Sequence, residues 1–177
     1  MNDEREKYII LLLGVDKKPV PSIWHLEKEM FMLSQASPKV QEFFNFEKHY
    51  NGPYSPILQE VVIEPLNYKD AYSYDDDGRI TLTSHGKQVF HFLKQENQTN
   101  EKFVTLLNLM ELIRILYDKL NKDELLFLIY KTYPEYIDFS NVHEKLNEKH
   151  MRIKLADSLK EKGLVTEERY SELIQAE

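Results

Sequence analysis

The segment HYNGPYSPILQEVVIEPL, residues 49–66, carries the clearest local structural signals in the chain. Its Asn-Gly-Pro step at 51–53 favours a turn. Ser55 then predicts a helix N-cap, and Pro56 predicts the first helical position, where a missing N–H costs nothing. Apolar residues follow at helical spacing, at Ile57, Leu58, Val61, Val62 and Leu66. The segment therefore predicts a turn and an amphipathic helix, which Pro65 ends or kinks.

This helix has an unusual charge. Between Ser55 and Tyr68 the sequence contains no Lys or Arg, and it contains Glu60 and Glu64. A helix that reads a DNA major groove normally offers cations and amides to phosphates and bases. The whole chain has a net charge of −7, so weak non-specific affinity for nucleic acid is expected.

Two helices and a short connection are expected before this segment. Residues 4–13 predict a first helix, and Gly14 is expected after it in the left-handed conformation that ends many helices. Ser22 predicts the N-cap of a second helix that runs to about residue 35. Pro38 predicts a short helix or turn, and a brief strand or extended arm is expected at Phe43, Phe44 and Phe46.

A hairpin is expected after the helix that Ser55 begins. Two short alternating runs, 71–74 and 79–83, flank the sequence Asp-Asp-Asp-Gly at 75–78, and Asp-Gly is a strong hairpin signal. Ser84 is expected to cap a further helix. The order helix, helix, helix, hairpin, helix is that of a winged helix-turn-helix domain, which we expect over residues 1–96.

The tip of this hairpin is acidic. Its carboxylates, Asp75, Asp76 and Asp77, have Arg79 as their single compensating cation. Carboxylates close to a phosphate backbone repel it, most strongly at low salt. The hairpin therefore gives a second argument against DNA binding at this surface.

The polar run QENQTN at 95–100 predicts a linker, and a helical domain is expected over residues 101–177. Its first helix, 103–120, is so apolar that it is either sandwiched within this domain, which we favour, or forms part of an oligomer interface. Asn121 with Glu124 predicts a capping box before a helix at 125–133. Two more helices are expected, at about 141–162 with a possible break, and at 167–176. The predicted fold class is mainly α with a small β-hairpin.

No catalytic, cofactor or metal site is expected. The chain has no cysteine, and its six histidines form no HExxH motif. His143 and His150 are expected to be packed or solvated, and the aspartates before Gly78 lack the acidic first and twelfth ligands of a calcium loop. Most aromatic residues fit a core, with Tyr50 and Tyr54 the most exposed. The apolar N-terminal run is too short for a membrane span, and its flank does not resemble a signal peptide.

Three segments are similar to known proteins. Residues 50–55 (YNGPYS) resemble the YGPYS signature before the third helix of a large group of prokaryotic winged-helix proteins, which includes the Panacea-domain antitoxins. Residues 123–136 resemble a segment that follows this domain in some relatives, and residues 153–170 resemble a tail of small antitoxin-like proteins. The chain departs from the signature by inserting Asn51 and by its acidic hairpin. The resemblance implies a non-enzymatic module that neutralises a toxin or acts as an adaptor.

We therefore expect a cytoplasmic regulatory or antitoxin-like protein that contacts another protein, such as a toxin, with a homodimer left open. The alternative is a transcriptional regulator that binds DNA as a dimer. Its cations would come from the start of the second helix or from Arg114, Lys119, Lys122, Lys131, Arg152 and Lys154. Partner contact is expected at Tyr50, Tyr54, Gln59, Glu60, Glu64, Asp75 and Asp76.

Overall fold

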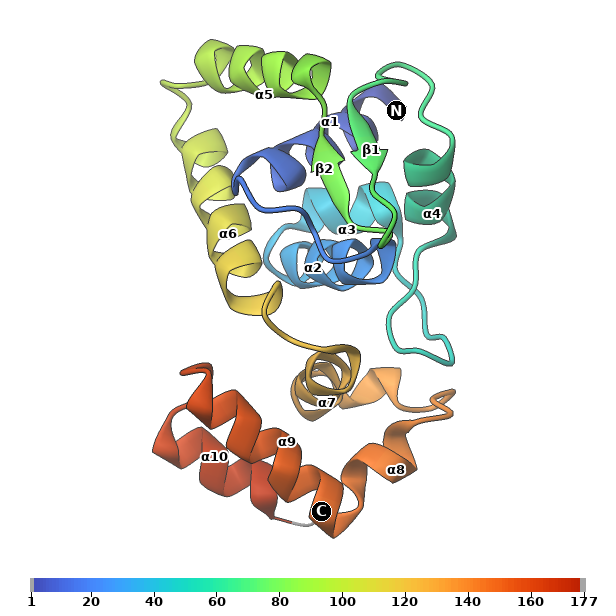
Figure 1. Cartoon of the computed structure of the whole chain (residues 1–177), viewed down its shortest axis with the longest axis vertical. Helices are drawn as coiled ribbons and strands as arrows, with labels where there is room; N and C mark the ends of the chain where they lie inside the picture. The colour runs from blue at the N-terminus through green and yellow to red at the C-terminus, as the bar shows by residue number, and fades with distance from the viewer. Residues whose placement is uncertain (1, 176–177) are drawn as a thin grey trace. The chain divides into compact units, whose positions relative to one another are not determined.

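The computed structural model describes residues 2–175 and is mainly helical, with a small two-stranded antiparallel sheet (Figure 1). The predicted fold class, mainly α with one hairpin, is confirmed at this level. The chain forms two compact units. The first contains the residues up to Phe46 and Ser55–Asp118, and the second contains Glu47–Tyr54 and the residues from Lys119 onward.

The first unit contains most of the described secondary structure. Its elements are α1 (Asn2–Gly14), α2 (Ile23–Ala36), α3 (Pro38–Phe44), α4 (Pro56–Ile63), β1 (Tyr72–Tyr74), β2 (Ile80–Leu82), α5 (Ser84–Glu96) and α6 (Glu101–Tyr117). Its core is centred on α1 and α2, and its fully buried side chains include Ile9, Ile10, Leu12, Leu26, Met30 and Phe31.

Gly14 has a different role from the predicted one. It is the last residue of α1, and it does not have the left-handed conformation that the sequence suggested. A Cβ atom at this position would lie 2.4 Å from the ring of Phe90 in α5. Glycine is therefore needed because α5 approaches the α1 backbone closely, and not because of the local backbone angles.

The predicted N-caps of α2 and α4 are confirmed. Ser22 accepts a hydrogen bond from the backbone N–H of His25. The Ser55 hydroxyl accepts from the Leu58 N–H at 3.0 Å and donates to the carbonyl of Phe44. Ser55 is fully buried, so one side chain both begins α4 and joins it to the end of α3.

The strand expected around the three phenylalanines is wrong for Phe43 and Phe44, which lie in α3. Pro38 starts this helix, and Phe44 is fully buried where α3 packs on α2. Burial thus overrides the strand preference of aromatic residues. Phe46 lies after the helix and packs edge-on against Phe31, with ring centroids 5.5 Å apart.

The predicted hairpin is confirmed. Tyr72 pairs with Leu82, and Tyr74 pairs with Ile80. Gly78 has a φ of 76°, as the Asp-Gly turn requires. Val20, in the connection between α1 and α2, forms a further antiparallel bridge with Ile80, so three segments of the chain lie side by side here.

The helix after the hairpin begins one residue earlier than predicted. Thr83, not Ser84, is the N-cap, because its hydroxyl accepts from the Gly86 N–H at 3.1 Å. The same hydroxyl donates to the carbonyl of Asp70, which joins the start of α5 to the segment before β1.

The helix α6 lies in the first unit, although the sequence predicted a C-terminal domain from residue 101. It packs on α1 and α2 and buries Leu107, Met110 and Ile113. Its burial is incomplete, since hydrophobic residues remain exposed at Val104, Leu112 and Ile115. The polar run at 95–100 is a connection within the first unit and does not separate the two units.

The second unit is helical, with α7 (Lys122–Thr132), the 3-10 helix η1 (Pro134–Tyr136), α8 (His143–Asn147), α9 (Lys149–Glu161) and α10 (Glu167–Ile174). The capping box of Asn121 and Glu124 is confirmed. The Glu124 carboxylate also accepts from Ser158 and from the Lys162 ammonium at 2.6 Å. Burial raises the pKa of Glu124, but these hydrogen bonds outweigh it and hold the pKa below its usual value. In residues 2–175 no helix is long and apolar enough to cross a membrane.

Candidate interaction surface

The residues predicted to contact a partner belong to two different units. Tyr50 and Tyr54 lie in the loop Glu47–Tyr54 of the second unit. The others lie in the first unit, on α4, just after it, and at the hairpin tip: Gln59, Glu60, Glu64, Asp75 and Asp76.

The loop Glu47–Tyr54 is fixed within the second unit. Glu47 and Tyr54 exchange two backbone hydrogen bonds of 2.8 and 2.9 Å, which close the loop. At its tip, Gly52 has a φ of 80°, and a Cβ there would lie 2.9 Å from the Leu126 side chain of α7. The Tyr50 carbonyl accepts from the Asn141 N–H at 3.3 Å. The predicted turn is therefore present and has a structural role.

The two tyrosines of this loop differ in exposure. The side chain of Tyr50 is 55% exposed, so it is available to a partner. Tyr54 is half-buried and stacks on His49, with ring centroids 4.7 Å apart. The prediction that these would be among the more exposed aromatics is met most clearly by Tyr50.

The outer face of α4 carries both acidic and apolar side chains. Glu60, Ile63 and Glu64 are exposed, while Leu58, Val61 and Val62 face the core. Leu66 was expected on the buried face, but it lies beyond the end of α4 and is 62% exposed. Ile63 is 63% exposed, so two aliphatic side chains stand at the surface beside two carboxylates.

Gln59 has an internal partner. Its amide donates to the Glu27 carboxylate of α2 at 3.1 Å, and the same oxygen accepts from the Ser55 N–H at 3.3 Å. The second oxygen of Glu27 accepts from the buried Lys28 at 2.9 Å. Burial lowers the pKa of Lys28, although Glu27 opposes this change. Gln59 therefore helps to orient α4 on α2.

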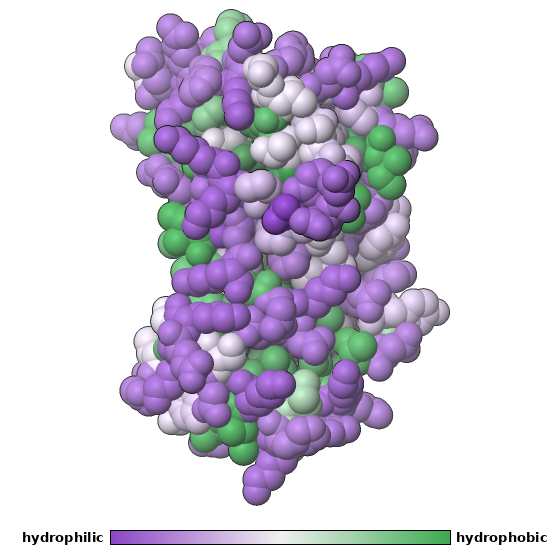
Figure 2. All heavy atoms as spheres, viewed as in Figure 1, coloured by the Kyte–Doolittle hydropathy of each residue, from purple (hydrophilic) through white to green (hydrophobic). Residues whose placement is uncertain are grey.

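The hairpin lies beside the end of α4. The hydroxyl of Tyr72 donates to the carbonyl of Val61 at 3.1 Å, and that of Tyr74 to the carbonyl of Val62 at 3.4 Å. We use the term α4–hairpin surface for the exposed residues of this region, which are Glu60, Ile63, Glu64, Leu66, Tyr74, Asp75 and Asp76. Figure 2 shows hydrophobic residues exposed over α4, at the right edge of the view, among hydrophilic ones.

A buried carboxylate that the sequence did not reveal holds Leu66 in place. Glu6 of α1 is fully buried and accepts backbone hydrogen bonds from Leu66, Asn67 and Tyr68 at 2.7 to 3.2 Å. Glu6 stands between Arg5 and Lys7 in a charged N-terminal run, and nothing in this local sequence indicates a buried position. Glu6 therefore fixes the backbone of Leu66 in a position that leaves its side chain exposed.

The hairpin tip keeps its acidic character. Arg79 pairs with Asp75 at 2.8 Å and with Asp77 at 2.7 Å, so its charge is already compensated within the turn. Hydrogen bonds from Arg79 hold the pKa of the Asp75 carboxyl below its usual range. The α4–hairpin surface is therefore anionic at neutral pH.

Two of the cations suggested for DNA contact are buried. Arg114 is fully buried, and Arg152 is 7% exposed and donates to the carbonyls of Asn147 and Ile174. These two guanidinium groups cannot reach phosphates. The ammonium-bearing residues Lys119, Lys122 and Lys154 are exposed, and Lys131 is half-buried.

The histidines considered for metal binding have other surroundings. His143 packs edge-on against Tyr130, with ring centroids 5.7 Å apart, and His150 is exposed next to Glu148. Over the described part of the chain, no group of three or more metal-ligating side chains comes together.

Comparison with family models finds none that matches this chain, and comparison with curated proteins finds no significant match.

Proposed function

We propose that this chain is a non-enzymatic regulatory protein, antitoxin-like in its mode of action, that binds another protein through a winged-helix scaffold. The bridge between Val20 and Ile80 supports the winged-helix assignment. It places a strand position between α1 and α2 next to β2, which in turn pairs with β1. In this assignment α4 occupies the place of the recognition helix, and residues 75–79 form the wing.

The observation that carries the proposal is the composition of the α4–hairpin surface. Its exposed aliphatic residues, Ile63 and Leu66, lie near Glu60 and Glu64, and the cation of the hairpin tip, Arg79, is paired with Asp75 and Asp77. Such a surface complements a basic amphipathic segment of another protein, because apolar contact supplies affinity and opposite charge supplies orientation. Burying one large aliphatic side chain contributes about 1.5–3 kcal/mol.

A capture experiment with matched variants tests this proposal. The tagged full chain and the double variant Ile63→Asp/Leu66→Asp are used to capture proteins from the source cells, and captured proteins are quantified by mass spectrometry. The product of a neighbouring gene is the first candidate to examine. Losing two aliphatic contacts should weaken partner binding by at least about a hundredfold. Ile115→Asp, on the exposed face of α6, is the control and should leave capture unchanged.

The same preparation is titrated with random duplex DNA in a gel-shift assay. We expect no binding at micromolar concentration and physiological salt. Binding in that range that is lost in Glu60→Ala or Ile63→Asp would overturn the proposal for this surface. Binding that is lost in Lys119→Gln/Lys122→Gln, with α4 variants unaffected, would favour the alternative of a DNA-binding regulator.

A further inference from the structure

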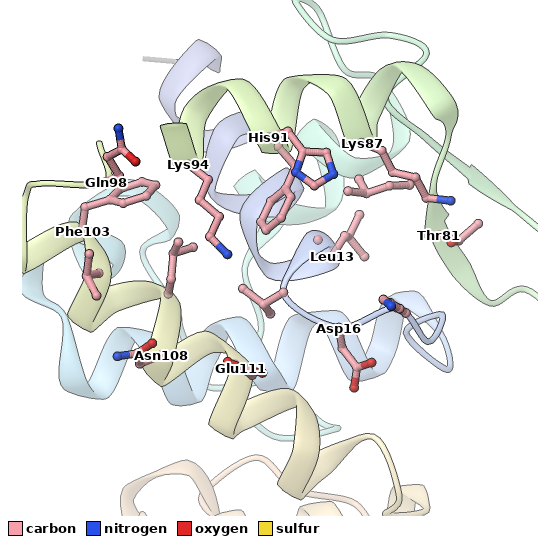
Figure 3. A pocket seen from close by; sticks show the side chains of 17 residues that line it. Leu13, Asp16, Thr81, Lys87, His91, Lys94, Gln98, Phe103, Asn108 and Glu111 are labelled. Atoms are coloured by element: carbon pink, nitrogen blue, oxygen red, sulfur yellow. The ribbon is translucent and has the colours of Figure 1, made fainter. Parts of the chain in front are cut away.

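A cavity of about 670 Å³ opens within the first unit, between α5, α6 and the turn after α1 (Figure 3). This volume lies in the range of about 300–1,000 Å³ that is typical of small-molecule sites. The floor of the cavity is apolar and buried, and it includes Leu13, Leu82, Phe90 and Leu107. A ligand with a hydrocarbon or aromatic body would remove this floor from water.

The α5 wall of the cavity is cationic. Lys87, His91 and Lys94 line it at positions i, i+4 and i+7, so they share one face of the helix. Figure 3 shows the Lys94 side chain extending from α5 into the space between α5 and α6. Two lysines on one wall of a cavity are a local exception in a chain whose net charge is −7.

The opposite wall has a different chemistry. Asp16 and Lys17, from the turn after α1, and Glu111, from α6, line it together with the amide of Asn108, so this wall has a formal charge of −1 where the α5 wall has two lysines. A ligand with one charged end is therefore oriented by the cavity. Its anionic end is drawn to α5 and kept away from Asp16 and Glu111.

Arg114 joins the α6 wall to the turn after α1. This fully buried residue of α6 donates to the carbonyl of Leu12 at 3.0 Å and to that of Lys18 at 2.7 Å. These hydrogen bonds join α6 to both ends of the turn that contributes Asp16. Because both ends of this turn are bonded to α6, ligand binding costs little free energy for ordering this side of the cavity.

We propose that this cavity binds an amphipathic monoanion, whose headgroup contacts Lys87 and Lys94 and whose apolar body covers Phe90 and Leu107. The site is separate from the α4–hairpin surface in its residues, and its occupation does not depend on the proposed partner. Lysine ammonium groups act as point charges, which suits a single carboxylate better than a large planar anion.

The test compares an anionic and a neutral ligand of equal length. The ¹⁵N-labelled full chain is titrated with octanoate and with 1-octanol, and chemical shifts are followed by NMR. Octanoate should shift the amides of Leu13–Lys17, α5 and α6 in a saturable manner. It should bind at least about tenfold more tightly than octanol, since hydrogen bonds between charged groups are worth more than neutral ones.

Three variants locate the site and the charge. Lys87→Gln/Lys94→Gln should lower octanoate affinity by about tenfold or more and leave octanol affinity unchanged. Val104→Trp, at a cavity position that is 39% exposed, should remove binding of both ligands by filling the entrance. Lys69→Gln, an exposed lysine that does not line the cavity, is the matched control and should bind as the unmodified chain does.

Several results would overturn the inference. Equal affinity for octanoate and octanol would do so, as would unchanged octanoate affinity in the double lysine variant. Saturable shifts outside the cavity, or no saturable binding up to the solubility of octanoate, would also contradict it. If Val104→Trp loses its dispersed spectrum, the double lysine variant still decides the question, because both of its substituted side chains are exposed.

Discussion

We expect the unmodified protein to lose stability as the pH rises because it buries Glu29. The variant Glu29→Gln should not show this loss. Glu29 of α2 is fully buried next to Asp118 and Arg114. Arg114 donates to Asp118 at 2.9 Å, whereas the Glu29 carboxyl lies 3.6 Å from the guanidinium. One cation therefore faces two carboxyl groups, and Asp118 is the one that it neutralises.

This arrangement favours a protonated Glu29. Burial, and then the neighbouring Asp118 carboxylate, raise the pKa of Glu29 well above its ordinary value of 4.5, although Arg114 opposes this. As ionised groups, both Glu29 oxygens and Oδ1 of Asp118 have no hydrogen-bond partner among the described residues. A proton on Glu29 allows it to donate to Asp118, which satisfies one donor and one acceptor in the same contact.

The magnitude follows from the number of protons. A carboxyl whose pKa is raised on folding contributes stability that is complete below its unfolded pKa and is lost as the pH rises towards its folded pKa. One proton corresponds to a slope of at most about 1.4 kcal/mol per pH unit. Glu29→Gln should therefore gain up to about 1.4 kcal/mol relative to the unmodified chain for each pH unit between the unfolded and the folded pKa of Glu29.

Urea unfolding at a series of pH values measures this difference. Subtracting the two curves cancels the contributions of other groups, such as Glu124, whose lowered pKa acts in the opposite direction. Glu60→Gln, at an exposed position, is the control and should run parallel to the unmodified chain. If the Glu29→Gln curve is also parallel, and lower at every pH, then Glu29 is ionised and paired with Arg114, and the reasoning is refuted.

Three further substitutions should destabilise the protein in urea or thermal unfolding. Gly52→Ala should lower the free energy of unfolding by about 1–3 kcal/mol, because φ is 80° there and the added Cβ would lie 2.9 Å from Leu126. An unchanged unfolding midpoint would contradict this. Glu6→Ala should cost at least about 3 kcal/mol, because it leaves the N–H groups of residues 66–68 without their acceptor. Asn121→Ala should cost about 1 kcal/mol through loss of the capping box, and retained stability would show that water replaces the cap.

The parts of the fold that the sequence predicted are those with local causes. Ser22, Ser55 and Asn121 were identified as N-caps because a cap bonds to N–H groups two or three residues away. The hairpin turn at Gly78 was identified for a similar reason, since its backbone conformation selects glycine. In these cases a few neighbouring residues determine the structure.

The missed features depend on residues far apart in the chain. Glu6, Glu29 and Arg114 are of charged types that are rarely buried, yet each is fully buried by partners that lie elsewhere in the sequence. Gly14 was assigned a backbone role, although its cause is the ring of Phe90. For the candidate surface, the sequence predicted the carboxylates of α4 and the hairpin but not the exposure of Leu66.

The boundary between the compact units likewise depends on contacts between residues far apart in the chain. The polar run at 95–100 was the natural place for a domain boundary, but a linker's composition does not show which surfaces the following helix will cover. The buried face of α6, with Leu107, Met110 and Ile113, packs on α1 and α2. After α6 the chain passes to the second unit at Lys119.

The segment Tyr50–Ser55 has a role that follows from this division. Tyr50–Tyr54 lies within the second unit, where Gly52 packs against α7, and Ser55 begins α4 in the first unit. The chain thus leaves the first unit after Phe46 and returns to it at Ser55. A second unit prepared without this loop would lack the packing of Gly52 near Leu126, and a continuous fragment of residues 1–118 would contain the loop without α7. Gly52, Tyr54 and Ser55 are therefore parts of the scaffold, whereas Tyr50 is exposed. Under the proposed function, partner specificity comes from the exposed carboxylates and aliphatic residues of the α4–hairpin surface.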